Sequence, residues 1–568
     1  MLRTIAGLMM LALASLPTTA LAGDGGACPR PAAGSDVTRP PDLFSQNGVL
    51  NVSLNYFTSV DSVGRTLFCF VTPDGLESPT LHVNPGDTIH IALTNALPPV
   101  PGAPSMRSSN DGSTVCGDAT MTVTSTNMHF HGTNTSPKCH SDEVIRTLVN
   151  SGETFDYTLH IPKDEPPGLY WYHPHIHGIS SQAVQGGATG AIEVEGIANV
   201  QPAVTGLPER YIVLRDQQRI IQANPPGGPF TPVPNWDVSV NYVPVSWPHY
   251  PPAVIRMQTG SREFWRVVNA GANTIMDIKL TYDGVAQPLE IVALDGVPTG
   301  SKDGRRQGTI ITQKEILLPP ASRAEFIVTA PSSSSTVAML STETIDGGPF
   351  GDSNPARPLA QIVASNAPAK LPKAAAPTGA SRAMRFGDLA NAKVTAQRTL
   401  YFSEKNPPAK APEKEGTAFF ITVDGQEEIP YDPNNPPAII TNKGAVEEWT
   451  IQNRTAEVHE FHMHQIHFLV EAVNGVPLHK KAQQLYDTFQ VGYWTGVGDY
   501  PSITAKLDFR GATVGDFVYH CHILDHEDRG MMAIIRVLPP GKTKDAHRVV
   551  PKRKLAARAS PVRVAARR

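Results

Sequence analysis

Residues that could bind a metal are concentrated near the end of the chain, in His520-Cys521-His522-Ile523-Leu524-Asp525-His526-Glu527-Asp528-Arg529-Gly530-Met531. The run Asp516-Phe517-Val518-Tyr519 before it is apolar and predicts a strand, whose side chains alternate between two faces. We therefore expect His520 and His522 on one face and Cys521 on the other. Such an arrangement could connect two metal centres through the main chain and suits electron transfer between them.

The thiolate side can be completed from other residues of the chain. One Cys, two His and a weak axial Met form the ligand set of a blue-copper electron-transfer site. His526 and Met531 lie five and ten residues after Cys521. The best candidate for the second histidine is His459, which opens His459-Glu460-Phe461-His462-Met463-His464.

Four histidine pairs share the spacing i, i+2. On a strand, this spacing places both imidazoles on one face. Eight convergent imidazoles are too many for one ion but suit a cluster of three coppers, which accept imidazole well. One such pair alone is more often a surface or packing feature, so only the four together favour a metal site. The pairs are His129/His131, His173/His175, His462/His464 and His520/His522.

These motifs, in this order, resemble the multicopper oxidases, the family of laccases, bilirubin oxidases, ferroxidases and bacterial cuprous oxidases. The N-terminal part of the resemblance lies in His129-Phe130-His131-Gly132 and in His173-Pro174-His175-Ile176-His177-Gly178 after Trp171-Tyr172. The resemblance covers residues 129 to 531. It implies an all-β fold of three cupredoxin-like β-sandwich domains in tandem, four copper ions, and oxidation of a donor coupled to reduction of dioxygen to water.

The resemblance also implies a role for each ligand. The type 1 copper would take His459, Cys521, His526 and Met531, and the type 2 copper would take His129 and His462. One type 3 copper would take His131, His173 and His522, and the other His175, His464 and His520. His177 and His467 extend two motifs without a ligand role, so we expect them to support the copper ligands from behind or to be structural.

Reduction of dioxygen consumes protons, so acidic residues should flank the cluster. Glu527 matches the family's acidic position six residues after Cys521. Asp142 is a looser match to the acid that follows the first histidine motif in the family. The segment before it, Ser136-Pro137-Lys138-Cys139-His140-Ser141, departs from the usual laccase sequence. A solvated loop carboxylate is the alternative for Asp142.

An internal repeat predicts the architecture. The segments 86–95, 260–269 and 444–453 each combine a turn glycine, an alternating strand and an asparagine nine residues later. Recurrence at domain-sized intervals favours three copies of a β-sandwich. We expect domains at residues 40–198, 205–365 and 384–540. Only His249 among 19 histidines lies between residues 200 and 400, so the middle domain should supply no copper ligand.

The two ends of the chain differ from its body. Residues 1–22 combine Arg3, an apolar run and Ala20-Leu21-Ala22, typical of a cleaved signal peptide, so we expect an exported protein, periplasmic or secreted. Residues 541–568 hold ten Lys or Arg and one Asp, which predicts a disordered basic tail or attachment to an anionic surface. We expect no membrane span and no nucleic-acid partner, and the sequence leaves the oligomeric state open.

Cysteine usage agrees with export. Cys28, Cys69, Cys116 and Cys139 lie in the first quarter of the chain, and Cys521 stands alone. An oxidising compartment would pair the first four as two disulfides, with three connectivities that the sequence does not separate. Buried thiols or a second metal site are the alternatives.

The substrate is less well predicted than the reaction. The first hypothesis is a laccase-like oxidase of phenolic or aromatic one-electron donors, and the second is a dedicated oxidase of Cu(I), Fe(II) or Mn(II). A non-catalytic cupredoxin scaffold is disfavoured because every expected ligand is present. Met531 stands where many fungal laccases carry Leu or Phe, and its thioether predicts a lower type 1 potential. The methionine-rich insert of cuprous oxidases is not visible in the third domain.

Overall fold

The computed structural model describes residues 28–99, 116–117, 120–220, 232–301, 308–368, 370–376, 385–406, 416–511 and 514–541. Within these ranges the chain is almost wholly β, as the sequence predicted. Helix is limited to α1 (Ser180–Gln185), α2 (Leu524–Glu527) and the 3-10 turns η1 (Ile197–Asn199), η2 (Pro202–Val204) and η3 (Leu389–Asn391). None of these described helices is long and apolar enough to cross a bilayer. The predicted signal peptide and all but Gly541 of the predicted tail lie outside the described residues.

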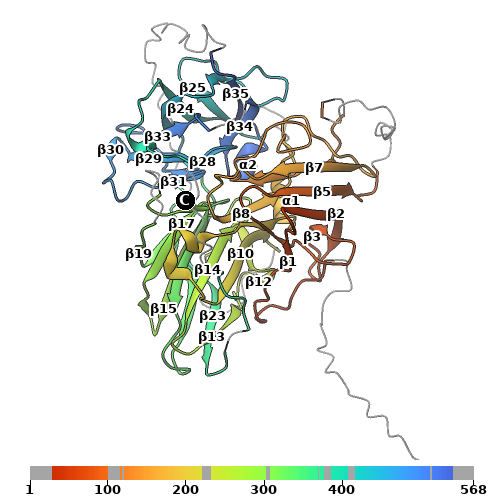
Figure 1. The fold of residues 1–568 in the computed structure, drawn as a ribbon, viewed down its shortest axis with the longest axis vertical. Helices are drawn as coiled ribbons and strands as arrows, with labels where there is room; N and C mark the ends of the chain where they lie inside the picture. Colours follow the sequence, from red (N-terminus) through yellow and green to blue (C-terminus); the bar gives the residue numbers. More distant parts are fainter. Residues whose placement is uncertain are drawn as a thin grey trace, which may run out of the picture.

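The strands form six sheets, two from each third of the chain (Figure 1). The N-terminal sheets have the orders β1 (Asp42–Phe44), β4 (Thr80–Val83), β9 (Gly190–Val194), β8 (Gly168–His173), β6 (His129–His131) and β3 (Thr66–Val71), β2 (Val49–Val60), β5 (Thr88–Asn95), β7 (Thr154–His160).

The middle sheets are larger. One has the order β12 (Val243–Val245), β11 (Trp236–Val240), β10 (Glu209–Gln218), β14 (Arg262–Asn269), β21 (Arg323–Thr329), β17 (Leu289–Leu294), β18 (Val297–Pro298), with β19 (Ile311–Gln313) beside β17. The other has the order β13 (Ala253–Gln258), β23 (Arg357–Ser365), β22 (Ala338–Thr342), β15 (Met276–Tyr282), β16 (Val285–Ala286), with β20 (Glu315–Leu318) beside β15.

The C-terminal sheets carry the second set of histidines. One has the order β25 (Ala418–Val423), β24 (Ala396–Lys405), β27 (Val446–Asn453), β33 (Ser502–Asp508), β29 (Phe468–Val473), β30 (Val476–Pro477), with β31 (Leu485–Tyr486) beside β29. The other has the order β26 (Ile439–Asn442), β35 (Met532–Leu538), β34 (Gly515–Cys521), β28 (His459–Met463), β32 (Thr488–Val491). The domain boundaries expected from the sequence stay a prediction.

The three sequence repeats form equivalent strands, β5, β14 and β27. Each pairs in parallel with the first long strand of its third, β2, β10 or β24, and antiparallel with β7, β21 or β33. The asparagine that ends each repeat is fully buried and donates two hydrogen bonds from Nδ2 to main-chain carbonyls, which satisfies a buried amide. The recurring asparagine therefore closes the end of the same strand in all three copies.

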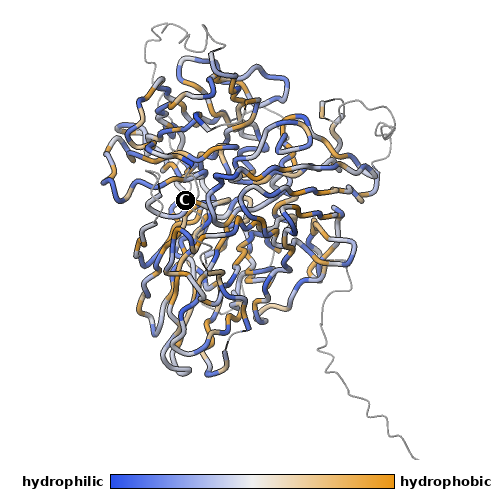
Figure 2. Tube along the Cα trace, in the orientation of Figure 1, coloured by the Kyte–Doolittle hydropathy of each residue, from blue (hydrophilic) through white to orange (hydrophobic). Residues whose placement is uncertain are grey.

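Each third has its own hydrophobic core. Along β2, alternate residues from Leu50 to Tyr56 are buried and their neighbours face outward, which is the period of a half-buried strand. Hydrophobic and hydrophilic residues alternate along many strands in Figure 2. Trp265 and Trp449 occupy the same position of two repeats and lie in the middle and C-terminal cores.

The three parts meet around α1 and α2. The Asp528 carboxylate, just after α2, accepts hydrogen bonds from the main-chain N–H groups of Gly178, Ser180 and Ser181 at 2.7, 3.1 and 2.9 Å. The Leu524 N–H donates to the carbonyl of Ala272 at 2.9 Å. Because the histidine motifs come directly before α1 and α2, this joint brings the N-terminal and C-terminal histidine motifs close together, and α1 and α2 lie near one another in Figure 1.

The cysteines are divided as the sequence predicted. Cys28 pairs with Cys69 and Cys116 with Cys139, while Cys521 is free and buried. The prediction of two disulfides is confirmed, and the structure selects one of the three connectivities.

Candidate metal centre

Eight histidines, four from the N-terminal third and four from the C-terminal third, converge in one place, which we call the histidine cluster. Strand pairing sets His129 opposite His173 and His462 opposite His520. The Nε2 atom of His520 lies 3.3 Å from that of His175 and 3.2 Å from that of His464. All eight side chains are buried. The members are His129, His131, His173, His175, His462, His464, His520 and His522.

The strand geometry expected for all four pairs holds for one of them. His129 and His131 both lie on β6. In each other pair the second histidine comes after the strand has ended, since β8 ends at His173, β28 at Met463 and β34 at Cys521. The turns that follow these strands, and not the pleat alone, bring the second imidazole back to the cluster.

In several rings, the nitrogen that is turned away from the centre of the histidine cluster makes a hydrogen bond. Nδ1 of His173 donates to the Pro174 carbonyl, Nδ1 of His462 to the Asp487 carbonyl, and Nδ1 of His520 to the Cys521 carbonyl, at 2.9, 2.7 and 2.9 Å. Nε2 of His173 and of His462 has no hydrogen-bond partner among the described residues. A metal-bound histidine commonly donates its other ring N–H to a carbonyl or carboxylate, so this pattern fits a metal.

The electrostatics of the cluster favour neutral imidazoles. Burial lowers the pKa of every ring, to about 3 for His173 and about 4 for His520. For His129 and His464, neighbouring imidazoles lower the pKa further. Neutral imidazole is the form that coordinates a metal.

The ligand atoms also group as metal sites would. The set His175, His464 and His520 has ligand atoms within 4.8 Å of one another, and it is one of the sets that the resemblance implied. Two other such groups, His129/His131/His173 and His129/His462/His464, mix members of the implied sets.

A second group, the cysteine cluster, lies on the other face of β28 and β34. Cys521 Sγ is 3.6 Å from Nδ1 of His459 and 3.8 Å from Nδ1 of His526. Met531 is fully buried. Its carbonyl accepts a hydrogen bond from the Cys521 N–H, and its N–H donates to the His526 carbonyl, each at 3.0 Å. Burial raises the pKa of the Cys521 thiol, so a cation would be needed to hold the thiolate.

Both acids expected from the sequence lie against the histidine cluster. The Asp142 carboxylate accepts from Nδ1–H of His129 at 2.9 Å and from Nε2–H of Gln465 at 2.7 Å, and burial raises its pKa to about 8. Asp142 is buried, which contradicts the alternative of a solvated loop carboxylate. Glu527 is buried 3.4 Å from Nδ1 of His520 and 3.8 Å from Nδ1 of His175. Burial raises its pKa well above the ordinary value.

The two extra histidines lie outside both clusters. His467 donates from Nε2 to the Asp295 carbonyl at 2.7 Å, and His177 packs edge-on against Tyr431. These contacts agree with the structural roles expected for them.

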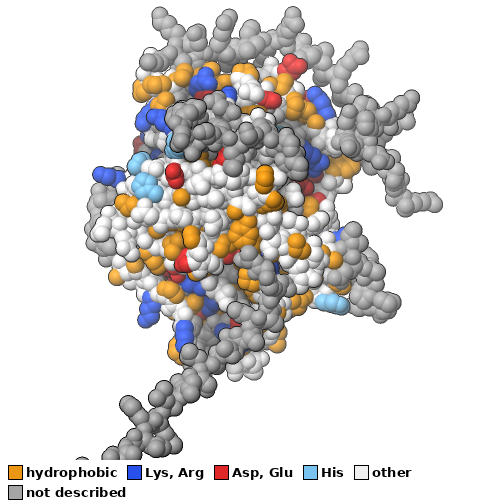
Figure 3. All heavy atoms as spheres, turned by 90° about the vertical axis from the view of Figure 1, so that its right-hand side faces the viewer, with side chains coloured by type: hydrophobic (Ala, Val, Ile, Leu, Met, Phe, Trp, Pro, Cys, Tyr) orange, Lys and Arg blue, Asp and Glu red, His pale blue; other side chains and the backbone are white. Residues whose placement is uncertain are grey.

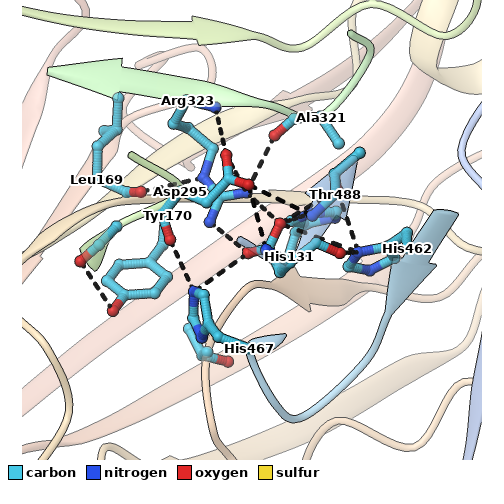
Figure 4. A network of polar contacts seen from close by, with 12 residues as sticks. His131, Leu169, Tyr170, Asp295, Ala321, Arg323, His462, His467 and Thr488 are labelled. Carbon is cyan, nitrogen blue, oxygen red and sulfur yellow. Dashed lines mark hydrogen bonds and ion pairs between the residues drawn. The ribbon is translucent and has the colours of Figure 1, made fainter. Parts of the chain in front are cut away.

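Sequence reasoning missed two groups of charged residues. Glu404 and Glu457 lie 3.4 and 3.6 Å from the outward Nε2 atoms of His459 and His526. Arg323 lies near His131 and His462 (Figure 4) and forms a buried ion pair with Asp487. Each of these residues contacts a segment distant in the sequence, so the sequence alone did not point to them.

Comparison with known proteins gives a consistent result. Two multicopper oxidase family models match residues 110–198 and 401–541. The multicopper oxidase mco of Staphylococcus haemolyticus is 31% identical over 128 residues, 22% of this chain and 26% of that protein, so the match spans about a quarter of the relative's length. Laccase-4 of Thanatephorus cucumeris is 22% identical over 80% of this chain and 85% of that protein.

Solved structures share the fold. The multicopper oxidase of Campylobacter jejuni, described as a metallo-oxidase, has a TM-score of 0.62 at 21% identity, with 90% of this chain and 96% of that one covered. A laccase-like multi-copper oxidase from Ochrobactrum sp., with activity towards lignin model compounds, has a TM-score of 0.59 at 18% identity, with 88% and 100% covered. The predicted all-β, cupredoxin-like fold is confirmed.

Proposed function

We propose that this chain, which belongs to the multicopper oxidase family, is a copper-dependent oxidase that takes electrons singly from a donor and reduces dioxygen to water. The observation that supports this most is the meeting of eight buried imidazoles from the N-terminal and C-terminal thirds beside a free cysteine with two histidines. These two clusters would let donor oxidation and oxygen reduction proceed at separate places.

We propose that the chain holds four copper ions. His459, Cys521, His526 and Met531 would hold type 1 copper, and His129 and His462 type 2 copper. His131, His173 and His522 would hold one type 3 copper, and His175, His464 and His520 the other. The buried ring nitrogens without hydrogen-bond partners, such as Nε2 of His129, His173 and His462, suit ions of this kind. Copper bound there would supply one-electron redox chemistry and the site for oxygen reduction.

The protein's own residues have three tasks in this proposal. Cys521 and its neighbours His520 and His522 connect the two clusters through adjacent main-chain bonds, which gives electrons a short path. Asp142 and Glu527, each beside a cluster histidine, would hold or transfer the protons that oxygen reduction consumes. The buried surroundings keep bulk water away from the histidines.

The reaction can be tested on copper-loaded protein. We expect four electrons of donor to be oxidised for each dioxygen consumed, without hydrogen peroxide, measured with an oxygen electrode and a peroxide assay. Stoichiometric release of peroxide would contradict reduction to water. If the protein is exported from cells supplied with copper and still contains none, the non-catalytic scaffold would be favoured instead.

The donor is proposed to be a phenolic or aromatic compound, with a metal ion as the second candidate. A specific observation favours the second: Glu404 and Glu457 lie beside the outward nitrogens of the two type 1 histidines. Burial and then the Glu404 carboxylate raise the pKa of Glu457, as expected of two close carboxylates. A cation such as Cu(I), Fe(II) or Mn(II) would relieve this repulsion.

Substrate ratios separate the two candidates. We would compare turnover of a phenolic dye and of Fe(II), Cu(I) and Mn(II) in the wild type and in Glu404→Gln/Glu457→Gln. A metal-ion oxidase should lose metal turnover in the double variant and keep dye turnover. Equal turnover ratios in both proteins would exclude the carboxylate pair as a metal-ion site. Glu428→Gln, which removes a surface carboxylate paired with Lys405, serves as the control.

We also propose that the protein is exported. The support is the signal-like sequence of residues 1–22 and the two disulfides, which persist in oxidising compartments. On the face drawn in Figure 3, hydrophobic side chains are scattered among polar and charged ones, as on many water-exposed proteins.

A further inference from the structure

We propose that Asp487, held by Arg323 from the middle third of the chain, is a positioning residue that decides which ring nitrogen of His131 faces the histidine cluster. The inference rests on the proposed function, since it concerns how the copper ligands are oriented. It gives the middle third, to which we assign no copper ligand, a direct part in building the site.

His131 differs from its neighbours in the nitrogen that it turns outward. Nε2–H of His131 donates to Asp487 Oδ1 at 3.1 Å, whereas His129, His173, His462 and His520 donate outward from Nδ1. Nδ1 of His131 is buried and has no partner among the described residues. Since a neutral imidazole has one acceptor nitrogen, an outward Nε2–H leaves Nδ1 as the nitrogen available to a metal.

Arg323 fixes the Asp487 carboxylate in place. Its Nη1 and Nη2 donate to the two oxygens of Asp487 at 2.8 and 2.5 Å, a bidentate pair with one defined orientation. The guanidinium is held in turn by the carbonyls of Leu169 and Ala321, at 3.1 and 3.0 Å. Both side chains of the pair are fully buried.

The same segment also orients His462. The Asp487 carbonyl accepts from Nδ1 of His462 at 2.7 Å. The Asp295 carboxylate, from the loop between β17 and β18, accepts from the N–H groups of Asp487 and Thr488 at 3.2 and 3.3 Å. Residues of the middle third therefore fix both the side chain and the main chain of Asp487.

A glycine is required after His131 because Arg323 and Asp487 lie close to the main chain there. A Cβ on Gly132 would collide with the side chains of Arg323 and Asp487, and its φ of +83° is unfavourable for other residues. The glycine of the motif His129-Phe130-His131-Gly132 thus makes room for the ion pair.

A structural ion pair and a positioning pair make different predictions. If the pair only stabilises the fold, its loss should lower the melting temperature without changing the copper sites selectively. If it positions His131, loss should weaken copper at the histidine cluster while copper at Cys521 stays. Such outer partners typically contribute about 10- to 100-fold to metal affinity.

The test uses the full-length, copper-loaded protein with Asp487→Asn and Arg323→Lys. Arg357→Lys is the matched control, because Arg357 is another buried arginine of the middle third, bonded to the Trp236 carbonyl and not to the cluster. Copper would be counted by mass spectrometry during titration with a chelator. Type 2 copper would be followed by electron paramagnetic resonance and type 1 copper by its visible band.

We expect both variants to keep the visible band and to release cluster copper at about 10- to 100-fold lower chelator concentration, with an altered type 2 spectrum. Wild-type release and spectra in both variants would overturn the inference, and so would equal copper loss in Arg357→Lys. If Asp487→Asn does not fold, the milder Arg323→Lys decides alone. A wild type that binds copper only at Cys521 would instead contradict the proposed function.

Discussion

His175 and His520 lie 345 residues apart in the sequence, yet their Nε2 atoms are 3.3 Å apart. Burial lowers the pKa of both rings, to about 4 for His520. Nε2 of His464 lies 3.2 Å from the same atom of His520. Because Nδ1 of His520 donates to the Cys521 carbonyl, its Nε2 offers one lone pair to two buried rings, which is a poor arrangement for stability alone. A shared group of metal ions gives their juxtaposition a physical reason.

Replacing the Cys521 thiol should remove the copper site of the cysteine cluster and leave copper at the histidine cluster in place. We expect Cys521→Ser to lose the intense visible thiolate-to-copper band and all turnover, because the hydroxyl is a poor copper ligand. The eight imidazoles are untouched, so copper at the histidine cluster should be kept. Absorption spectra and copper counts check this, and a variant that stays blue would show that Cys521 is not the type 1 ligand.

The methionine should tune the type 1 potential. We expect Met531→Leu to keep its copper and to raise the reduction potential, because the axial ligand tunes such sites. A rise of about 60 mV would be a tenfold change in the one-electron equilibrium constant. Redox titration of the visible band measures it. An unchanged potential would mean that the thioether does not contact the metal.

The buried acids should affect turnover and not copper binding at Cys521. We expect Glu527→Gln and Asp142→Asn to lower kcat by about 100-fold or more, as for loss of a general acid, with the visible band intact. Glu143→Gln is the control, since its carboxylate is bonded to Thr147 and not to a cluster histidine. Wild-type kcat in both variants would remove these acids from proton transfer.

A histidine away from the metal centre should make stability depend on pH. Burial alone would lower the pKa of His82, but its hydrogen bonds to Asp42, Glu193 and Glu195 raise it to about 11. A raised folded-state pKa contributes stability that is complete below the unfolded value of about 6.5 and is lost as pH rises toward 11.

His82→Gln should therefore lower the melting temperature more at pH 6 than at pH 10. His90→Gln, a change at an exposed histidine of the same third, should have little effect at either pH. Thermal unfolding at both pH values measures this. An equal loss for His82→Gln at both would show that the ring is not charged in the folded protein.

The fold was largely predictable because its signals are local. The repeated glycine, alternating strand and asparagine follow from turn geometry and from one face of each strand being buried, and they mark β5, β14 and β27 correctly. The histidine pairs were recognisable for the same reason, although the turns after His173, Met463 and Cys521 do part of the positioning.

The rest of the site depends on contacts between distant segments. Arg323 and Asp487 lie 164 residues apart. Glu404 lies on β24, and Glu457, although it comes two residues before His459, contacts His526 from a distant segment. The disulfide connectivity was open for the same reason. Tertiary packing, between the thirds for Arg323 with Asp487 and within the C-terminal third for Glu404 and Glu457, decides which buried charge meets a histidine.

The central claim is that histidines of the N-terminal and C-terminal thirds form one copper cluster beside a separate cysteine site. The number of coppers per chain tests it most directly. Metal mass spectrometry of purified, copper-loaded protein should give four coppers per chain, with one of them lost in Cys521→Ser. A wild-type protein that shows the blue band but holds a single copper would contradict the claim.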